Sequence, residues 1–451
     1  MPIPTAVAAS LLLTASSHPA QVPPPPPADA ELLELRARVA KLEGQVTGLE
    51  SEKDVVWLGE ERAKQIRSVV HEVLADSDTR TSLQDAGALA GWNNGMFIKS
   101  ADGNFLLSIR GQMQIRAVWN SQEDSPTDDD RYGVEMRRAK LFFTGHFMDP
   151  SWQYELELDA DRATGTVTLG EGAWVQKNLG DGFKIRAGQF KPMLLREEAV
   201  SARRLLGVER SQVNNVFTAG VAQGVQFMYE AERWRVATSI IDGFGSRNTA
   251  WNAEDSEFAG TARGEFLPIG EWKAVEDDVG FDGTPQSLLI GAAAGYQQQE
   301  FGTGTGGGTF NDAETSDLRL TADLTYKVSR FSIAGALIVR NVETEDDVPG
   351  AFDRDQLAAV LRAGFFLTDD IELYGMYEWG DLDIADQSDL STLTLGVTKY
   401  WAKHGLKWQS DIGYGFNPVS SDWAQPSAGW RADAPGEDGQ LVIRSQLQLW
   451  F

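Results

Sequence analysis

The amino-acid sequence predicts an all-β fold, a transmembrane antiparallel β-barrel of about 16 strands preceded by a short α-helical coiled coil. Three observations carry this prediction. From about residue 96 onward, apolar and polar residues alternate over segments longer than an ordinary strand of about 5–6 residues. Tight turns alternate with long acidic or glycine-rich connections in the same region. The chain ends on an alternating segment whose last residue is Phe451.

The composition excludes several other classes of protein. Of 451 residues, 40 are Lys or Arg and 66 are Asp or Glu, and the net charge of −26 argues against nucleic acid as a partner. There is no cysteine and there are only 4 histidines, so we expect no metal and no cofactor. No apolar run approaches the roughly 18–20 residues of a transmembrane helix, so a membrane role requires a β-barrel.

No catalytic motif stands out, and we expect the protein not to be an enzyme. The stretch Gly302–Gly308 lacks the Gly-Lys-Ser/Thr of a phosphate-binding loop and is typical of a flexible external loop. His146 and His404 have no nucleophile pattern beside them. A catalytic dyad assembled across strands would leave no motif and is the alternative.

The first 30 residues predict export followed by a spacer. Residues Ala6–Ala15 are mostly small or apolar, which is typical of a secretory signal, and we assign residues 1–20 to a signal peptide. No Lys or Arg precedes this stretch, so an ordinary N-terminal tail or a misassigned start codon is the alternative. The run Pro23–Pro27 predicts a stiff polyproline II spacer over residues 21–30.

Residues 31–92 predict a helical extension that lies in the periplasm. Its apolar residues recur with spacings of 3 and 4, which indicates a coiled coil of about three heptads. The alternative is one amphipathic helix that packs on another surface. The residues of the repeat are Leu32, Leu35, Val39, Leu42, Val46 and Leu49.

Residues 96–451 predict the barrel. In residues 105–120 the odd positions are mainly apolar and most even positions are polar. A membrane-spanning strand needs about 9–11 residues, so this segment is long enough to cross a bilayer and face a watery lumen. Similar segments follow at residues 138–147, 152–159, 166–178, 183–187, 224–230, 234–241, 258–266, 287–297, 318–327, 331–340, 357–365, 371–379, 390–401, 406–415 and 441–451.

The strand register places a set of cations on the lumen face, where they could select the solute. A slip by one residue would move them to the lipid face at a cost of about 2–4 kcal/mol each, so the inward register is favoured. Two interpretations stay open: an anion-attracting wall, or ion pairs with lumen acids such as Glu155, Glu157, Asp323, Glu372 and Glu378. The candidate residues are Arg110, Arg116, Arg138, Lys140, Lys184, Arg186, Arg319, Arg362 and Arg444, with Lys191 at a rim.

Four segments resemble the phosphate-selective porin O/P family of bacterial outer membranes. They are Phe105–Gly111, Arg137–Leu141, Arg186–Pro192 with its Gly-Gln-Phe-Lys-Pro run, and Glu209-Arg210-Ser211 followed by Gly224-Val225. The resemblance covers residues 96–451 and is densest from 96 to 230. It implies a sixteen-stranded, trimeric, water-filled channel, and a helical extension similar to periplasmic coiled coils of some members. The terminal Phe451 resembles the signal that the barrel-assembly machinery reads.

The family motif Gly188, Gln189, Phe190, Lys191 and Pro192 also has a physical interpretation. Proline cannot donate to a sheet ladder, so Pro192 is expected to end a strand. The motif is then a turn that folds a constriction inward, and Lys191 lies at a rim or on a loop. A direct role of Lys191 in solute recognition is the alternative.

Together these observations predict an outer-membrane porin for passive diffusion of small hydrophilic solutes and ions, with anions such as phosphate as the candidate preference. The expected partners are further copies of the chain in a trimer, outer-membrane lipid and the barrel-assembly machinery. The acidic loops would oppose anion entry over about 8 Å at physiological salt. The alternative function is a structural barrel whose coiled coil tethers the membrane to the cell wall.

Overall fold

The computed structural model of the protein describes residues 38–41, 88–122, 130–161, 164–251, 256–301, 313–344, 352–434, 437 and 439–451. The chain divides into two compact units, residues 1–80 and 81–451. In the first unit, residues 38–41 are helical. The predicted signal peptide (1–20), the spacer (21–30) and most of the helical extension (31–92) lie outside the described residues. Among those described, no helix has the length and apolar character needed to span a membrane.

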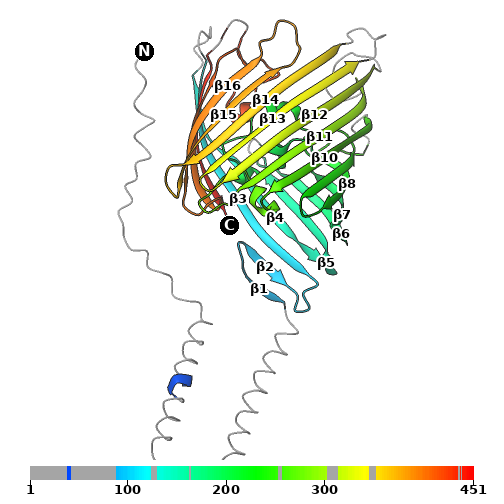
Figure 1. The fold of residues 1–451 in the computed structure, drawn as a ribbon, viewed down its shortest axis with the longest axis vertical. Coiled ribbons are helices and arrows are strands. Elements are labelled where there is room, and N and C mark those ends of the chain that lie inside the picture. Colours follow the sequence, from blue (N-terminus) through cyan, green and yellow to red (C-terminus); the bar gives the residue numbers. More distant parts are fainter. Residues whose placement is uncertain are drawn as a thin grey trace, which may run out of the picture. The chain divides into compact units, whose positions relative to one another are not determined.

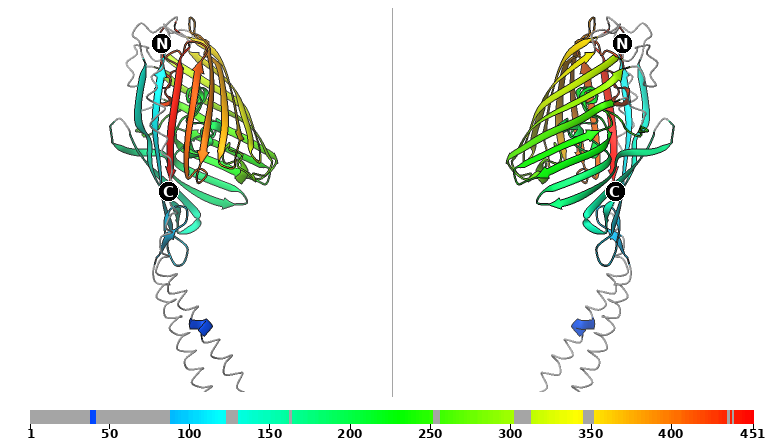
Figure 2. Two further views of the ribbon diagram at one scale, coloured as in Figure 1. Left: turned by 90° about the vertical axis from the view of Figure 1, so that its left-hand side faces the viewer. Right: turned by 90° about the vertical axis from the view of Figure 1, so that its right-hand side faces the viewer.

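Sixteen strands of the second unit, β3 to β18, close into a barrel (Figure 1). Each strand pairs antiparallel with the next, and β18 pairs with β3 to complete the ring. The strands are tilted in both side views, as closure of a barrel requires (Figure 2). Their bounds are β3 Leu106–Ser121, β4 Arg131–Phe147, β5 Asp149–Ala160, β6 Val167–Gly180, β7 Phe183–Phe190, β8 Ala222–Glu230, β9 Trp234–Ile241, β10 Ser256–Ile269, β11 Ser287–Phe301, β12 Ala313–Val328, β13 Phe331–Thr344, β14 Asp353–Phe366, β15 Ile371–Asp381, β16 Leu390–Tyr400, β17 Leu406–Gly415 and β18 Leu441–Trp450.

The predicted antiparallel β-barrel and its number of strands are confirmed, the coiled coil stays a prediction, and one boundary is wrong. The sequence predicts a helical extension up to residue 92, whereas β1 (Leu89–Trp92) is a strand that pairs with β2 (Met96–Lys99). The turn between them uses positive φ angles at Asn94 and Gly95, which suits a hairpin. In turn, β2 pairs with the first four residues of β3, beyond the end of β18. The hairpin thus covers an otherwise open strand edge, and the barrel itself begins at β3.

The end of the chain is part of the barrel closure. The Phe451 N–H donates to the Gly111 carbonyl at 3.0 Å, and the Gly111 N–H donates to the Phe451 carbonyl at 2.7 Å. A Cβ atom on Gly111 would lie 2.3 Å from the Phe451 ring, so the ring occupies space that glycine leaves free. The role of Phe451 as an assembly signal stays a prediction.

The two ends of the barrel carry connections of different length. At one end, here called the turn end, β6 joins β7 through residues 181–182, and β14 joins β15 through 367–370. At the other end, the loop end, the connections are longer, as in residues 382–389 between β15 and β16. One connection departs from the predicted alternation: residues 270–286, with η2 (Trp272–Val275), form a long segment at the turn end.

The outer surface is apolar and the inner face is polar, as β12 illustrates. Leu318, Leu320 and Leu324 are exposed on the outside, whereas Arg319 and Asp323 are buried inside the barrel. This alternation fixes the register, because a slip by one residue would exchange the two faces.

Aromatic rings gather near both ends of the outer surface. At the turn end, Trp234 and Phe266 stack with ring centroids 4.2 Å apart, and at the loop end Phe258 and Tyr296 lie 6.3 Å apart. Aromatic girdles of this kind flank the apolar band of outer-membrane barrels.

Candidate functional site

The connection between β7 and β8 runs inside the barrel. This inner segment, residues 191–221, contains α3 (Arg196–Ala199), η1 (Ala202–Arg204) and α4 (Gln212–Phe217). The chain leaves β7 at Lys191 and Pro192, since proline cannot donate to a ladder. Just before, Gly188 has φ of 127°, and a Cβ there would lie 2.3 Å from the Ala173 carbonyl oxygen. Glycine is therefore required at the point where the chain turns inward.

Side chains from the far wall of the barrel hold the inner segment in the lumen. They donate to its backbone carbonyls, which have no sheet partner and must be satisfied when buried. The inner segment is thus a bound element of the lumen wall rather than a free loop. The donors are Arg263 to Leu194 (3.0 Å), Arg319 to Phe217 (3.2 Å), Lys407 to Leu205 (3.0 Å), Gln409 to Leu206 (2.9 Å) and Gln448 to Arg203 (3.0 Å).

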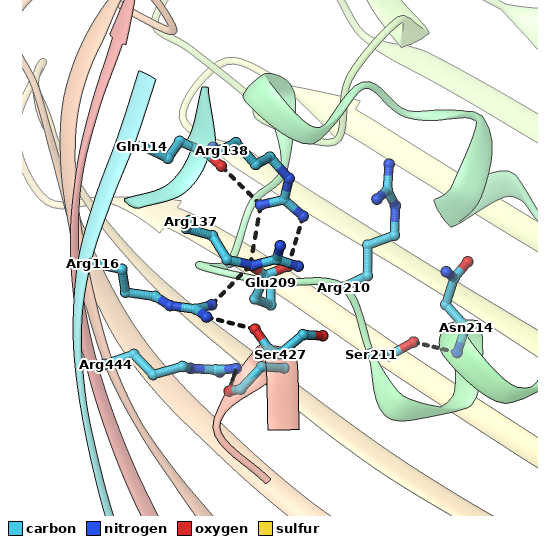
Figure 3. Close-up of polar contacts among 12 residues, drawn as sticks. Gln114, Arg116, Arg137, Arg138, Glu209, Arg210, Ser211, Asn214, Ser427 and Arg444 are labelled. Carbon is cyan, nitrogen blue, oxygen red and sulfur yellow. Dashed lines mark hydrogen bonds and ion pairs between the residues drawn. The ribbon is translucent and has the colours of Figure 1, made fainter. Parts of the chain in front are cut away.

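Glu209 of the inner segment draws together three arginines from β3 and β4 (Figure 3). Its Oε1 accepts from Arg116 Nη1 at 2.8 Å and from Arg137 Nε at 2.6 Å. Its Oε2 accepts from Arg138 Nη2 at 2.9 Å. Burial raises the pKa of the Glu209 carboxyl, but Arg138, Arg137 and Arg116 outweigh it and hold the pKa well below its usual range. One ionised carboxylate therefore partly neutralises three guanidinium groups.

A β-bulge brings Arg137 into this cluster. In the pairing of β3 with β4, Gln114 faces Arg138 and Ile115 faces Met136, so Arg137 has no partner across the strand pair. Regular alternation would place Arg137 on the lipid face, because its neighbour Arg138 faces inward. The extra residue lets two consecutive arginines reach one carboxylate.

A second network lies toward the turn end. The Lys140 Nζ is 2.8 Å from Glu157 Oε1 and 3.0 Å from Glu171 Oε1. The Lys191 Nζ is 2.7 Å from Glu171 Oε2 and 2.8 Å from Glu198 Oε1. These five side chains form an alternating chain of charge from the wall of the barrel to the inner segment.

The position of Glu171 also depends on an irregular strand. Register shifts between β5 and β6 leave residues 170–172 opposite a single residue of β5. Glu171 would otherwise share the outer face with Leu169 and Ala173, two positions away on either side. The flanking Gly170 and Gly172 leave room for glutamate side chains of β5, since Cβ atoms there would lie 2.4 and 2.1 Å from them. The bulge thus turns a second charged residue into the lumen.

Two cavities lie along the wall formed by β3 to β7, and both are lined by Lys140 and Glu171. The loop-end cavity has a volume of about 400 Å³, and the turn-end cavity about 370 Å³. The loop-end cavity is charge-balanced. Its cations are Arg137, Arg138, Lys140, Arg210 and Arg247, and its acids are Asp159, Asp161, Glu171, Glu198 and Glu209.

The turn-end cavity carries an excess of positive charge. Its cations are Arg110, Lys140, Arg186, Lys191 and Arg203, and its acids are Glu155, Glu157 and Glu171. Within the described part of the chain, three of these cations have no carboxylate within 4.0 Å. They are Arg110, which donates to the Asn94 carbonyl, Arg186, which donates to Gln176 and lies over Trp174, and Arg203, which lies over Trp450.

The opposite side of the lumen is filled by apolar side chains. The inner segment packs there against residues 416–434, which follow β17 and include η3 (Pro426–Ala428). Phe217 and Trp423, with ring centroids 6.0 Å apart, and Trp430 are fully buried in this cluster. The barrel is thus divided into a polar passage side, β3 to β7, and a filled side, β10 to β18.

The structure distributes the predicted site residues over both sides. On the passage side, Arg116 and Arg138 both contact Glu209. Lys140 and Lys191 both contact Glu171. Arg110 and Arg186 line the turn-end cavity. Lys184 lies outside both cavities and pairs with Glu230 at 3.4 Å. On the filled side, the ion pairs are Arg319 with Asp317 (2.6 Å), Arg362 with Glu197 (2.6 Å) and Asp278 (2.9 Å), and Arg444 with Asp411 (2.7 Å).

The remaining residues of the family motifs stabilise the inner segment and the strands beside it. Gln189 donates to the Gly170 carbonyl at 2.6 Å, and Phe190 is buried. Arg210 donates to the Val200 carbonyl at 2.8 Å. The Ser211 hydroxyl caps α4 by accepting the Asn214 N–H at 2.9 Å.

The alternation of apolar and polar residues does not assign several residues of the site to the lumen. Arg137 and Glu171 reach the lumen only through bulges, so strict alternation hides them. Arg203, Glu197 and Glu198 lie in the inner segment, where no period exists to assign a face. Among the described residues, no group of three or more His, Asp or Glu side chains is arranged to hold a metal ion.

A closed sixteen-strand barrel with an apolar outer belt and a charged lumen defines an outer-membrane porin. Residues 108–412 match the family described as phosphate-selective porin O and P. The chain belongs to this family, as the sequence resemblance predicts. A search of curated proteins finds no match.

Solved structures of outer-membrane proteins show the same fold. The anion-selective porin from Comamonas acidovorans is 14% identical, with a TM-score of 0.54 over 76% of this chain and 99% of that chain. The outer membrane channel DcaP of Acinetobacter baumannii is 12% identical, with a TM-score of 0.52 over 80% and 100%. OmpT, an outer membrane protein of Vibrio cholerae, is 14% identical, with a TM-score of 0.51 over 77% and 98%. At such low sequence identity, the structural likeness shows that the fold is shared and nothing more.

Proposed function

We propose that the protein lets small hydrophilic solutes and ions diffuse passively along the passage side of its barrel. The observation that carries this proposal is the succession of two polar cavities, about 400 and 370 Å³, that meet at Lys140 and Glu171. Because the far side of the lumen is filled, the route is narrower than the barrel itself. This role is that of a channel and needs no catalytic group.

The proposed ion preference is for anions. Among the described residues, Arg110, Arg186 and Arg203 of the turn-end cavity have no carboxylate within 4.0 Å, so the field there attracts negative charge. In the loop-end cavity Arg137 and Arg138 are already paired with Glu209, and Arg210 and Arg247 with Glu198 and Asp159. Phosphate would therefore have to compete with a fixed carboxylate at that point, and we expect a modest general anion preference with phosphate as one permeant anion.

Planar-bilayer recording tests both the passive channel and its preference for anions. We expect discrete conductance steps in KCl, and a reversal potential under a KCl gradient that shows chloride to be more permeant than potassium. Absence of steps from a membrane-inserted, folded barrel would contradict the channel. A preference for potassium would contradict the anion selectivity and leave the channel standing.

We also propose that the chain assembles as a homotrimer, since a solved Vibrio cholerae OmpT structure, 15% identical with a TM-score of 0.50, is described as a trimer form. Native mass spectrometry of the detergent-solubilised protein tests this, and a monomer at all concentrations would contradict it. A periplasmic location of residues 31–92, contact with the barrel-assembly machinery and the cell-wall tether stay predictions. Deletion of residues 30–75 separates the two functions, because a porin retains its conductance.

A further inference from the structure

The turn-end cavity combines aromatic and apolar surfaces with guanidinium groups that have no carboxylate within 4.0 Å among the described residues. Arg186 lies over the Trp174 ring at 4.0 Å, and Arg203 lies over the Trp450 ring at 4.2 Å. Phe142 packs against Trp450 with ring centroids 5.1 Å apart and lines the same cavity. Stacking on a tryptophan holds the plane of each guanidinium. The Nε and Nη2 of Arg186 donate to Gln176 Oε1, which leaves its Nη1 side to meet a solute.

Charge in this cavity is incompletely balanced. Arg203 belongs to η1 of the inner segment, and burial, with repulsion from Arg204 and Arg110, lowers its pKa to about 10. A bound carboxylate would relieve this repulsion. Arginine side chains recognise carboxylates through paired N–H donors, which supply geometry as well as charge.

The lining also distinguishes this cavity from the loop-end one. Besides its aromatic rings, the turn-end cavity is lined by Met193, Ala199 and Ala202. The loop-end cavity has Ala160 and Val221 as its apolar side chains larger than glycine. Inorganic phosphate gains nothing from an apolar lining, whereas an organic acid buries its hydrocarbon body there.

From these observations, and resting on the proposed channel function, we propose that the turn-end cavity is a binding subsite for aromatic monocarboxylates. The carboxylate is held between Arg186 and Arg203, and the ring of the solute lies against Trp174, Phe142 and Trp450. The cavity volume of about 370 Å³ accommodates a benzoate-sized solute with water.

The test is benzoate added to single channels recorded in KCl. We expect benzoate to interrupt the current in a concentration-dependent way. The half-blocking concentration of phosphate, and that of the neutral analogue benzyl alcohol, is expected to be at least tenfold higher than that of benzoate. The variants Arg186→Gln and Arg203→Gln are each expected to raise the half-blocking benzoate concentration about tenfold or more, the usual scale for losing a charged hydrogen bond. Arg186→Lys keeps the charge without the paired donors, and is expected to restore less than half of the loss.

The matched control is Arg330→Gln. This arginine is also at the turn end, but it pairs with Asp282 at 3.1 Å on the surface and lines neither cavity. Its benzoate block is expected to equal that of the unmodified protein. Block that survives both Arg186→Gln and Arg203→Gln, or that Arg330→Gln weakens equally, overturns the subsite. Phosphate block as strong as benzoate block overturns the solute class.

A second measurement separates the subsite from the channel function. Isothermal titration of benzoate into the folded, detergent-solubilised full chain reports binding without current. If the unmodified protein binds benzoate but shows no conductance, and Arg186→Gln abolishes the binding, the subsite is supported and the channel is refuted. Conductance with no benzoate binding or block overturns the subsite and leaves the channel. Retained folding of each variant is checked by its heat-dependent shift in gel mobility.

Discussion

The passage side and the filled side of the barrel use the same kind of strand for opposite purposes. On the passage side, charged side chains of β3 to β7 face cavities and pair in extended networks around Glu209 and Glu171. On the filled side, buried pairs such as Arg444 with Asp411 stand beside packed tryptophans. A closed barrel therefore does not fix the size of its channel; the connections folded into it do.

The largest expected effect comes from Glu209→Ala. Within the described part of the chain, removal of the carboxylate leaves Arg137 and Arg138 without a paired carboxylate, and leaves Arg116 with Glu135 alone. Loss of one partner of a buried ion pair costs about 3–5 kcal/mol. We expect a decrease of this size in the free energy of unfolding, measured by denaturant titration in detergent, and a higher chloride-to-potassium permeability ratio in bilayers.

The control for this variant is Glu276→Ala, since Glu276 is a half-exposed partner of Arg204 at the turn end. We expect that change to cost less than about 1 kcal/mol. Equal stability of Glu209→Ala and the unmodified protein would refute the view that Glu209 holds the passage side together.

The next effect is expected on the filled side, from Trp423→Ala. Trp423 is 1% exposed and packs against Phe217 of the inner segment. Truncation of a buried tryptophan costs about 3–5 kcal/mol, and we expect the low end because water can enter a lumen cavity. Single-channel conductance is expected to rise as the filled side opens. The control is Trp401→Ala, which is 57% exposed; a conductance change as large there would contradict the comparison.

Acid is expected to loosen the filled side first. Burial lowers the pKa of His404, in the turn between β16 and β17, to about 4, against 6.5 in the unfolded chain. As the pH falls, the unfolded state therefore takes up the proton before the folded state does. The contribution of neutral, buried His404 to the free energy of unfolding is complete above pH 6.5 and is lost as the pH falls toward 4. The loss amounts to at most about 3 kcal/mol. Thermal unfolding between pH 4 and 7 measures this slope.

The variant His404→Gln should flatten the stability profile between pH 4 and 6.5. Glu209, whose pKa is lowered, contributes its own loss only at pH values below the ordinary glutamate pKa of about 4.3. An unchanged slope between pH 4 and 6.5 in His404→Gln would show that other groups cause the acid response.

The smallest effect is expected from Lys184→Gln. The Lys184–Glu230 pair is 3.4 Å long and both side chains are about a third exposed, at 32% and 38%. Such surface pairs contribute at most about 1 kcal/mol, so stability and permeability ratio should stay within error of the unmodified protein. A shift of the reversal potential in this variant would mean that rim charge, and not the cavities, sets selectivity.

The sequence predicted the strands well because their period of two is a local property. The segment predicted at 331–340 is the first part of β13, and that at 406–415 is β17 itself. The inward register of Arg116, Arg138 and Lys140 also follows from alternation, since the opposite register would put charge in lipid.

What the sequence could not show depends on long-range contact. The inner segment has no period, so its contacts with β17 and β18 through Lys407 and Gln448 are visible only in three dimensions. The choice between an anion-attracting wall and paired charges also needed the partners of each arginine. Arg138 is paired with Glu209, as the ion-pair interpretation expects. The anion-attracting wall stays a proposal, supported by Arg186, which has no carboxylate within 4.0 Å among the described residues.

The bulge at Arg137 has a genetic consequence. Because this residue has no partner across the strand pair, its codon can be lost without changing which of the flanking residues face inward: Arg138 and Glu135 keep the lumen side and Met136 the lipid side. A single in-frame deletion would remove one positive charge from the Glu209 cluster and leave the rest of the strand in phase. Charge that lines the loop-end cavity can therefore be gained or lost in one mutational step.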